Sequence, residues 1–600
     1  MPYVLLVSKK LISQMSSMRL PLFAAILLAF TSTHSLVQAQ IKPPEVCPRP
    51  SAASPIPEPE DLRSENGVLK VELSFRSEVD DHGRMRYCYI YENRIESPNL
   101  RLHPGDLLIL TLRNGLTMKG GVQSPMVMGN RVSSRENAGS DSCKSMQMTA
   151  VSTNLHFHGL TIPPVCHQDD VLKTAIQPAD APFEYRFRIP KDQPPGLYWY
   201  HPHLHGFTRV QVMGGASGAL IVEGIEQANQ EVAGLPERVF VIRDEELLNL
   251  NAVPKGGGPQ APPAILDRDG DARNTGDGTG KPAKDLSVNF VSSAYPDYQS
   301  GIIQMKPSER QYWRVVNASS ITYLNLQLLV DGKPQMFGIV GVDGAPINVT
   351  GGTYVVWQNH LGIPPGGRSE FIVQGPPDGA EATLITRSVN TGPGGENDPT
   401  RTIARIVVTP GAAEPKSRLS TTTMQASSSN LPWVGSVTPV RTRRLYFSEK
   451  LEDPKDPNSP TTFYLTVEGQ PPAPFDPQSF EPNIVVHQGD VEDWVVENRS
   501  QEVHDFHIHQ VHFLMLEWFG IPINEPFLRD TVPVPFWDGK TTQYPTVKLR
   551  MDFRDSNAIG LFPYHCHLLE HEDGGMMGLI RVDPQPAQRV GAPAKGKQTP

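Results

Sequence analysis

The chain has 600 residues, which is too long for a single hydrophobic core and predicts about three or four domains. Charged residues make up 20% and hydrophobic residues 38%, as in a soluble globular protein, and the net charge of −10 argues against nucleic acid as a partner. The 58 prolines and 50 glycines indicate many short elements and turns, which is typical of all-β folds.

The N-terminus has the features of an export signal. A basic segment that ends at Arg19 precedes the apolar run 20–30, and the VQAQ that follows offers a cleavage site after Ala39. The run is too short to span a bilayer, and no later segment resembles a membrane span. We therefore expect a signal peptide at 1–39 and an exported protein, periplasmic or secreted, in a compartment where disulfides persist.

An internal repeat divides the rest of the chain. Three segments share one template: a turn, an acidic residue, an alternating apolar strand and a final asparagine. They are HPGDLLILTLRN, which ends at Asn114, KPSERQYWRVVN, which ends at Asn317, and HQGDVEDWVVEN, which ends at Asn498. The asparagines lie at domain-sized separations. We predict three related β-sandwich domains at 60–226, 235–410 and 438–585, followed by a disordered tail at 586–600.

Histidines gather in four short motifs outside the second repeat. The motifs are HFHG, WYHPHLHG, HDFHIHQVH and YHCHLLEHEDGGMM, and their candidate metal ligands are His156, His158, His201, His203, His504, His507, His509, His565, Cys566, His567, His571 and Met576. Successive side chains of a β-strand point to opposite faces, so H-x-H places two imidazoles on one face. His565 and His567 are therefore expected to share a face, with Cys566 on the other.

The third motif repeats this division. His507 and His509 share a face, and His504, offset by three residues, points away. One face of the two strands can thus supply Cys566 and His504, while the other face can supply four imidazoles. We interpret the two strands as serving two metal sites at once.

The cysteine side predicts a blue-copper centre. A thiolate with two imidazoles and a weak axial thioether is the ligand set of such a site. His571 and Met576 follow beyond the strand end, where a loop can return, and Met577 is the rival axial ligand. On the other face, eight imidazoles from four strands suit a cluster of several coppers. A single zinc would need three or four ligands and no interleaved cysteine.

The repeat also indicates which domain lacks these ligands. The three histidines of HDFHIH lie at fixed distances along the chain after Asn498. At the same distances after Asn317, the second domain has Tyr323, Leu326 and Leu328. In the first domain, Pro202 stands where Cys566 stands in the third. We therefore expect no copper in the second domain, imidazoles alone from the first, and a copper cluster between the first and third domains.

The four histidine motifs resemble the four copper motifs of the three-domain multicopper oxidases, in the segments HFHG, YWYHPH, HDFHIH and HCHLLEHEDGGMM. This family includes laccases, bilirubin oxidases and bacterial cuprous oxidases. The segments GGASGALIVEG and RDTVPVP extend the resemblance over nearly the whole mature chain. The resemblance implies an all-β fold of three consecutive cupredoxin-like Greek-key β-sandwich domains. It also implies four copper ions as cofactors: one of type 1, one of type 2 and two of type 3.

The family pattern, carried over by position, assigns each ligand to a copper. His504, Cys566 and His571 would bind the type 1 copper, with Met576 as the axial ligand. His156 and His507 would bind the type 2 copper. The type 3 pair would be bound by His158, His201, His203, His509, His565 and His567. Strand parity alone does not separate the type 2 from the type 3 ligands.

The resemblance implies a monomeric oxidase that takes single electrons from a small-molecule or metal-ion donor and reduces dioxygen to water. A laccase-like activity on phenols and aromatic amines is the first expectation. A cuprous oxidase is the alternative, because soft thioethers favour Cu(I) and the insert 115–151 carries Met118, Met126, Met128, Met146 and Met148. Methionines also fill irregular gaps under loops. A non-catalytic copper-binding protein of this fold would be expected to have lost ligands, and none is missing.

Dioxygen reduction needs protons as well as electrons. By resemblance, Glu572 and an acid at Asp169 or Asp170 are the candidate catalytic acids, against the alternative of solvated surface carboxylates. His205 and His512, which lie beside candidate ligands, are expected to be second neighbours of the metals or core residues.

Four cysteines remain besides Cys566, and they allow three pairings. An exported protein favours bridges over free thiols. We prefer Cys143–Cys166 together with Cys47–Cys88. The first bridge would tie the insert 115–151 to the loop after HFHG.

Overall fold

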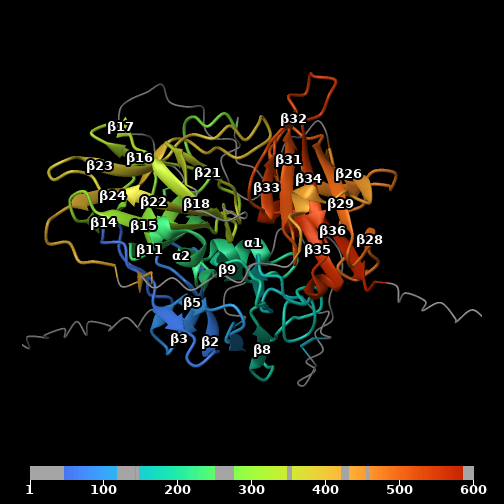
Figure 1. The fold of residues 1–600 in the computed structure, drawn as a ribbon, viewed down its shortest axis with the longest axis horizontal. Coiled ribbons are helices and arrows are strands. Elements are labelled where there is room, and N and C mark those ends of the chain that lie inside the picture. The colour runs from blue at the N-terminus through green and yellow to red at the C-terminus, as the bar shows by residue number, and fades with distance from the viewer. Residues whose placement is uncertain are drawn as a thin grey trace, which may run out of the picture. The chain divides into compact units, whose positions relative to one another are not determined.

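The computed structural model describes residues 46–117, 142–143, 148–249, 276–347, 355–415, 417–419, 431–453 and 459–585 (Figure 1). The expected signal peptide at 1–39, the expected tail at 586–600 and all the methionines of the insert except Met148 lie outside these residues. Within them the regular structure is almost entirely β-strand, and no helix is long and apolar enough to cross a membrane.

The first two sheets are built from residues 61–222, drawn from blue to green in Figure 1. One sheet has the strand order β1 (Asp61–Arg63), β5 (Asn99–Leu102), β10 (Gly218–Val222), β9 (Gly196–His201) and β7 (His156–His158). The other has the order β4 (Ile95–Glu96), β3 (Met85–Tyr91), β2 (Val68–Val79), β6 (Leu107–Asn114) and β8 (Phe183–Arg188). Strand β8 alternates buried aromatic and exposed charged residues, as a strand with one face on the core should.

A second pair of sheets, green to yellow in Figure 1, follows after α1 (Thr208–Met213), α2 (Ile225–Ala228) and the 3-10 turn η1 (Gln230–Val232). The larger sheet contains β13 (Val291–Ser293), β12 (Asp285–Val288), β11 (Pro236–Glu245), β15 (Arg310–Asn317), β22 (Arg368–Gln374), β18 (Phe337–Val342), β19 (Ala345–Pro346), β20 (Val356–Gln358) and β25 (Ser417–Arg418). The smaller contains β14 (Gly301–Met305), β24 (Arg401–Val408), β23 (Ala382–Thr386), β16 (Leu324–Val330), β17 (Lys333–Pro334) and β21 (Leu361–Ile363).

The third pair, orange to red in Figure 1, follows the 3-10 turn η2 (Val434–Ser436). One sheet has the order β27 (Thr461–Val467), β26 (Arg441–Leu451), β29 (Val491–Asn498), β34 (Thr546–Asp552), β31 (Phe513–Trp518) and β32 (Ile521–Pro522). The other has β28 (Ile484–His487), β36 (Met577–Asp583), β35 (Gly560–Cys566), β30 (His504–Ile508) and β33 (Thr531–Val534). The short elements η3 (Ser556–Ala558) and α3 (Leu569–Asp573) flank β35.

Each pair of sheets encloses its own hydrophobic core, which confirms the predicted all-β fold of three consecutive sandwiches. Here we call them the first, middle and third sandwich. The exact domain limits expected from the sequence stay a prediction. In the middle sandwich, Leu326 and Leu328 are core residues of β16, at the positions where the third sandwich has histidines.

The repeat has the same structural role in all three sandwiches. The template strands are β6, β15 and β29, and each ends at its asparagine. The side-chain amide of that asparagine donates to two backbone carbonyls: Val151 and Ile176 for Asn114, Thr322 and Ile363 for Asn317, and Glu502 and Val534 for Asn498. In the third sandwich this amide ties down the turn that leads into β30, the strand that carries the HDFHIH histidines.

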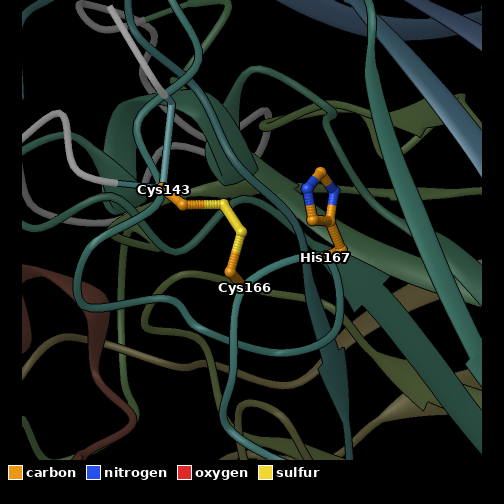
Figure 2. Close-up of side chains that lie close together, drawn as sticks. All are labelled: Cys143, Cys166 and His167. Carbon is orange, nitrogen blue, oxygen red and sulfur yellow. A yellow bond between two sulfur atoms is a disulfide. The ribbon is translucent and has the colours of Figure 1, made fainter.

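Both preferred disulfides are present. Cys47 is bonded to Cys88 of β3, and Cys143 is bonded to Cys166 in the loop after β7 (Figure 2). A ring nitrogen of His167 lies within 4.8 Å of both sulfurs, and its Nδ1 is 2.7 Å from the carbonyl oxygen of Glu184 (Figure 2). Since both sulfurs are consumed by the bridge, this trio is not a metal site.

Alkylation of the denatured, unreduced protein should therefore label one cysteine, Cys566, which is the free and buried thiol. Peptide mass mapping before and after reduction checks this result. After reduction, the four cysteines of the two bridges should become labelled as well. Labelling of Cys143 or Cys166 without reduction, in protein from an oxidising compartment, would contradict the pairing.

Candidate metal centre

Strand register brings the histidine motifs together in pairs. In the first sandwich β7 and β9 are antiparallel neighbours, with His156 opposite His201. In the third sandwich β30 and β35 are antiparallel neighbours, with His507 opposite His565 and Phe506 opposite Cys566. Each sandwich therefore presents two adjacent strands that carry imidazoles, and the side chains of the two sandwiches meet: His203 Nε2 is 3.2 Å from His565 Nε2.

Cys566 forms one compact group with two histidines. Its Sγ lies 3.6 Å from His504 Nδ1 and 3.8 Å from His571 Nδ1, and the two Nδ1 atoms are 3.1 Å apart. All three residues are buried. His571 comes from the short helix α3 rather than from the loop expected after the strand.

The two methionines that follow α3 differ in their surroundings. Met576 is fully buried in the same hydrophobic core as Cys566, and its carbonyl oxygen accepts a hydrogen bond from the backbone N–H of Cys566. Met577 instead lines a small cavity together with His203 and Phe475. This difference favours Met576 over Met577 as the axial ligand.

The other eight imidazoles fall into three of the compact groups found among the described residues, two of which share His509, and within each group the ligand atoms lie within 4.8 Å of one another. The groups are His156 with His507 and His509; His158 with His201 and His567; and His203 with His509 and His565. Every group combines histidines of the first and third sandwiches. The middle sandwich contributes none of these imidazoles.

Unpartnered ring nitrogens show that these groups suit metal ions. The Nε2 atoms of His156, His158, His201 and His507 are buried and have no hydrogen-bond partner among the residues that the structure describes. Their Nδ1 atoms face other groups: the carboxylate of Asp169 for His156, and the carbonyl oxygens of Pro202 and Asp530 for His201 and His507. An imidazole that donates from Nδ1 exposes a lone pair on Nε2, which is the form that binds a metal.

The surroundings also set the protonation of the ligands. Burial, followed by the neighbouring imidazoles, lowers the pKa of His156 and His203 well below the usual value, so both are neutral and able to bind a cation. Burial raises the pKa of the Cys566 thiol well above its usual value. A thiolate at this position therefore requires a bound cation.

Of the three candidate acids, two contact the histidine groups. Both carboxylate oxygens of Asp169 are 3.0 Å from His156 Nδ1, and Asp169 also accepts hydrogen bonds from the Gln510 side chain and the Phe157 N–H. Glu572 is completely buried, which excludes a solvated surface carboxylate. Its carboxylate lies 3.6 Å from His203 Nδ1 and 3.4 Å from His565 Nδ1.

Asp170 is not part of this arrangement. Its carboxylate accepts a hydrogen bond from the backbone N–H of Lys173, and its carbonyl oxygen accepts one from Thr174. These contacts stabilise the turn that follows Asp169. His205 and His512 agree with the expectation of second neighbours: His205 packs edge-on against Phe475, and His512 Nε2 lies 3.2 Å from the carbonyl oxygen of Asp343.

Sequence reasoning missed several acidic and basic residues around the histidines. Asp530 is buried beside His507, and Arg368 of the middle sandwich forms an ion pair with it. Glu449 and Glu502 contact the outer nitrogens of His504 and His571. Asp530 lies in RDTVPVP, a segment that is part of the family resemblance. Arg368, Glu449 and Glu502 lie in none of the motifs described above.

The three sandwiches have the cupredoxin-like fold expected from the sequence, and the two buried residue sets have the composition of copper sites. Profiles described as "Multicopper oxidase" match residues 146–227 and 454–586, so the resemblance to the multicopper oxidase family is confirmed. The chain is 24% identical over 442 residues to the multicopper oxidase mco of Staphylococcus haemolyticus, covering 72% of this chain and 77% of that protein. It is 23% identical over 412 residues to a laccase of Bacillus subtilis, covering 65% and 71%.

The fold agrees with solved structures of the family. A multicopper oxidase from Campylobacter jejuni, described as a metallo-oxidase, superposes with a TM-score of 0.59 at 23% identity. The match covers 90% of this chain and 96% of that one.

The separation of the two ligand sets can be tested by removing the thiol. Cys566→Ser should abolish the blue absorption of the cysteine site and leave copper at the histidine groups, because the thiol lies on the opposite face of the strand from His565 and His567. The reciprocal variant His509→Gln should deplete the histidine groups and retain the blue colour. Copper content and electron paramagnetic resonance measure both. Loss of all copper together in Cys566→Ser would contradict the division.

Proposed function

We propose that the protein is a laccase-like multicopper oxidase that oxidises phenols and aromatic amines one electron at a time and reduces dioxygen to water. One observation carries the proposal: Cys566 belongs to a buried Cys–His set, while the residues on either side of it, His565 and His567, belong to two different histidine groups. A donor site and a dioxygen site are thus joined through consecutive residues.

In this proposal the ligand sets hold four copper ions. His504, Cys566 and His571, with Met576 as axial ligand, hold the type 1 copper, and His156 and His507 hold the type 2 copper. The type 3 pair is held by His158, His201, His203, His509, His565 and His567. The compact groups of imidazoles support this division: His158, His201 and His567 form one and His203, His509 and His565 a second, while the third joins His156 and His507 to the shared His509. The two disulfides support an exported protein, periplasmic or secreted.

Bound copper would supply one-electron oxidation at the cysteine site and dioxygen reduction at the histidine groups. The chain's own contribution is the path between them. Cys566 is covalently connected to His565 and His567 through single peptide units, so an electron that enters at the thiolate reaches either histidine group without crossing a gap between side chains. The carbonyl oxygen of Cys566 also lies 2.9 Å from His565 Nδ1, which fixes the ring on this path.

Glu572 is the residue best placed to hold a proton near the histidine groups. Thr208 Oγ1 donates to its Oε1 at 3.1 Å, and its two oxygens face His203 and His565. Burial, followed by the charge of Asp573, raises the pKa of Glu572 well above its usual value. Asp169 accepts two hydrogen bonds besides its contact with His156, so we assign it to holding that ring in place.

Glu572→Gln should slow reoxidation by dioxygen about 10²–10⁴-fold, the usual contribution of a positioned acid. Glutamine keeps the size and hydrogen bonding of glutamate but cannot transfer a proton. Copper content, the blue band and reduction by the donor should stay as in the wild type. Single-turnover kinetics separates the two half-reactions.

Glu570→Gln is the matched control, because Glu570 lies on the same helix but pairs with Arg209 near the surface. The control should behave as the wild type. If Glu572→Gln also reoxidises at the wild-type rate, the proton route does not include Glu572.

A second candidate function is the oxidation of metal ions. The carboxylates beside His504 and His571 favour it. His504 Nε2 lies 2.9 Å from Glu449 Oε1, and His571 Nε2 lies 3.1 Å from Glu502 Oε1. The two carboxylates are close enough to share a proton: burial, followed by the charge of Glu449, raises the pKa of Glu502. Paired carboxylates suit harder divalent ions such as Mn²⁺ or Fe²⁺ rather than Cu(I).

Two further observations bear on this second candidate. The relative from Campylobacter jejuni is described as a metallo-oxidase. Of the insert's methionines the structure describes Met148, which is partly buried and packs against Leu204 and Phe207, as a methionine that fills a gap under a loop would.

A donor panel distinguishes the two candidates. With dioxygen as acceptor, we expect the wild type to oxidise a methoxyphenol with a higher kcat/KM than Fe²⁺ or Cu(I). Glu449→Gln and Glu502→Gln should weaken use of Fe²⁺ by about 10-fold or more, because each removes a charged contact. Glu517→Gln, in the same sandwich but paired with Lys548, is the control and should change neither donor. A wild type that prefers Fe²⁺ would replace the first candidate by the second.

A further inference from the structure

The middle sandwich contributes no imidazole, yet its strand β22 begins at the edge of the histidine groups. Arg368, the first residue of β22, is completely buried. Its Nη1 and Nη2 donate to the two carboxylate oxygens of Asp530 at 2.7 and 2.6 Å. Asp530 belongs to the third sandwich and directly precedes β33. This bidentate ion pair therefore joins the middle and third sandwiches beside the candidate metal centre.

The same ion pair faces histidines of the first and third sandwiches. His507 Nδ1 is 2.8 Å from the carbonyl oxygen of Asp530, and His158 Nδ1 is 3.2 Å from Arg368 Nη1 and 3.8 Å from Asp530 Oδ2. Since arginine can only donate, the hydrogen bond at 3.2 Å runs from Arg368 Nη1 to His158 Nδ1, and the 3.8 Å to Asp530 Oδ2 is too long for a second one. The opposite Nε2 atoms of both histidines have no partner among the described residues.

Two glycines allow this close approach. Gly159, which completes HFHG, has φ +86°, and a Cβ at this position would lie 2.7 Å from Asp530 Oδ2 and still closer to Arg368 Nη2. Gly366 of the middle sandwich has φ +79°, and a Cβ there would lie 2.7 Å from Cε1 and Nε2 of His567. Only glycine combines the left-handed backbone with so little space.

We infer that the middle sandwich, which contributes none of the grouped imidazoles, forms one wall of the histidine cluster, with Arg368 and Gly366 as positioning residues for His158, His507 and His567. Arg368 neutralises Asp530 in a buried environment, donates to Nδ1 of His158, and holds in place the residue whose carbonyl oxygen faces Nδ1 of His507. Gly366 places backbone against the ring of a third. This inference rests on the proposed function, because it takes the three histidines to be copper ligands of the cluster.

The test compares two arginines of the same sheet. Arg368→Lys keeps the positive charge but removes the bidentate hydrogen bonding to the carboxylate of Asp530. Arg314→Lys is the matched control: Arg314 is equally buried and is paired with Glu237 and Glu370, none of which contacts a candidate ligand in the described contacts. Each purified holoprotein is dialysed against a copper chelator. Retained copper, the blue band, the type 2 paramagnetic resonance signal and thermal unfolding are then recorded.

We expect Arg368→Lys to lose cluster copper at about 10- to 100-fold lower chelator concentration than the wild type and to show an altered type 2 signal, with the blue band unchanged. Arg314→Lys should lower the unfolding temperature but keep the wild-type copper retention and type 2 signal. Equal retention and equal spectra in the two variants would reduce Arg368 to a structural ion pair and overturn the inference.

A second pair of variants tests the inference even if the arginine variants do not fold. Gly366→Ala should alter the cluster signals by pressing on His567. Gly332→Ala, at a φ of +72° with no atom within 4 Å of the added carbon, carries the same backbone strain without the clash and should leave them unchanged. Identical cluster signals in these two variants would overturn the role of Gly366. A wild type that binds type 1 copper alone would refute the proposed function itself, and the inference with it.

Discussion

Strand β35 ends in His565 and Cys566, whose side chains leave the backbone on opposite faces, and the rest of the site is arranged around that division. The thiol face meets His504 of β30 and His571 of α3, and the imidazole face meets the first sandwich. Neither face could be changed without moving the other, because they share consecutive residues. The two sites are therefore coupled through the geometry of one strand.

Three of the buried imidazoles share one pattern. His156, His201 and His507 each have an unpartnered Nε2 and an Nδ1 that faces a fixed oxygen, of Asp169, Pro202 and Asp530 respectively. This arrangement selects the neutral form with its lone pair directed inward. A buried nitrogen without a partner costs about 1–3 kcal/mol, and a metal ion bound at these atoms would offset that cost.

The three sandwiches contribute differently to this arrangement. The first and third supply the ligands, and the middle one supplies Arg368 and the close backbone at Gly366. On the donor side, the third sandwich adds Glu449 and Glu502 against the outer nitrogens of His504 and His571, while Phe447 and Phe463 pack on the ring faces. In the proposed oxidase these carboxylates would make the surroundings of the outer nitrogens polar, while one aromatic side chain covers a face of each imidazole.

The amino-acid sequence by itself determined the all-β class, the repeated asparagine turns and the division of Cys566 from its neighbouring histidines. These properties follow from local rules, namely strand alternation, turn chemistry and the spacing of one motif. The preferred pair of disulfides, by contrast, was selected among three possible pairings by the tertiary structure. Only the tertiary structure decided between Asp169 and Asp170, showed that Glu572 is buried, and revealed Arg368, Glu449 and Glu502 beside the histidines. Arg368 and Asp530 are 162 positions apart in the chain, and His203 and His565 are 362 apart. Contacts of this kind depend on how three separate sandwiches pack, and no periodicity within a single strand carries that information.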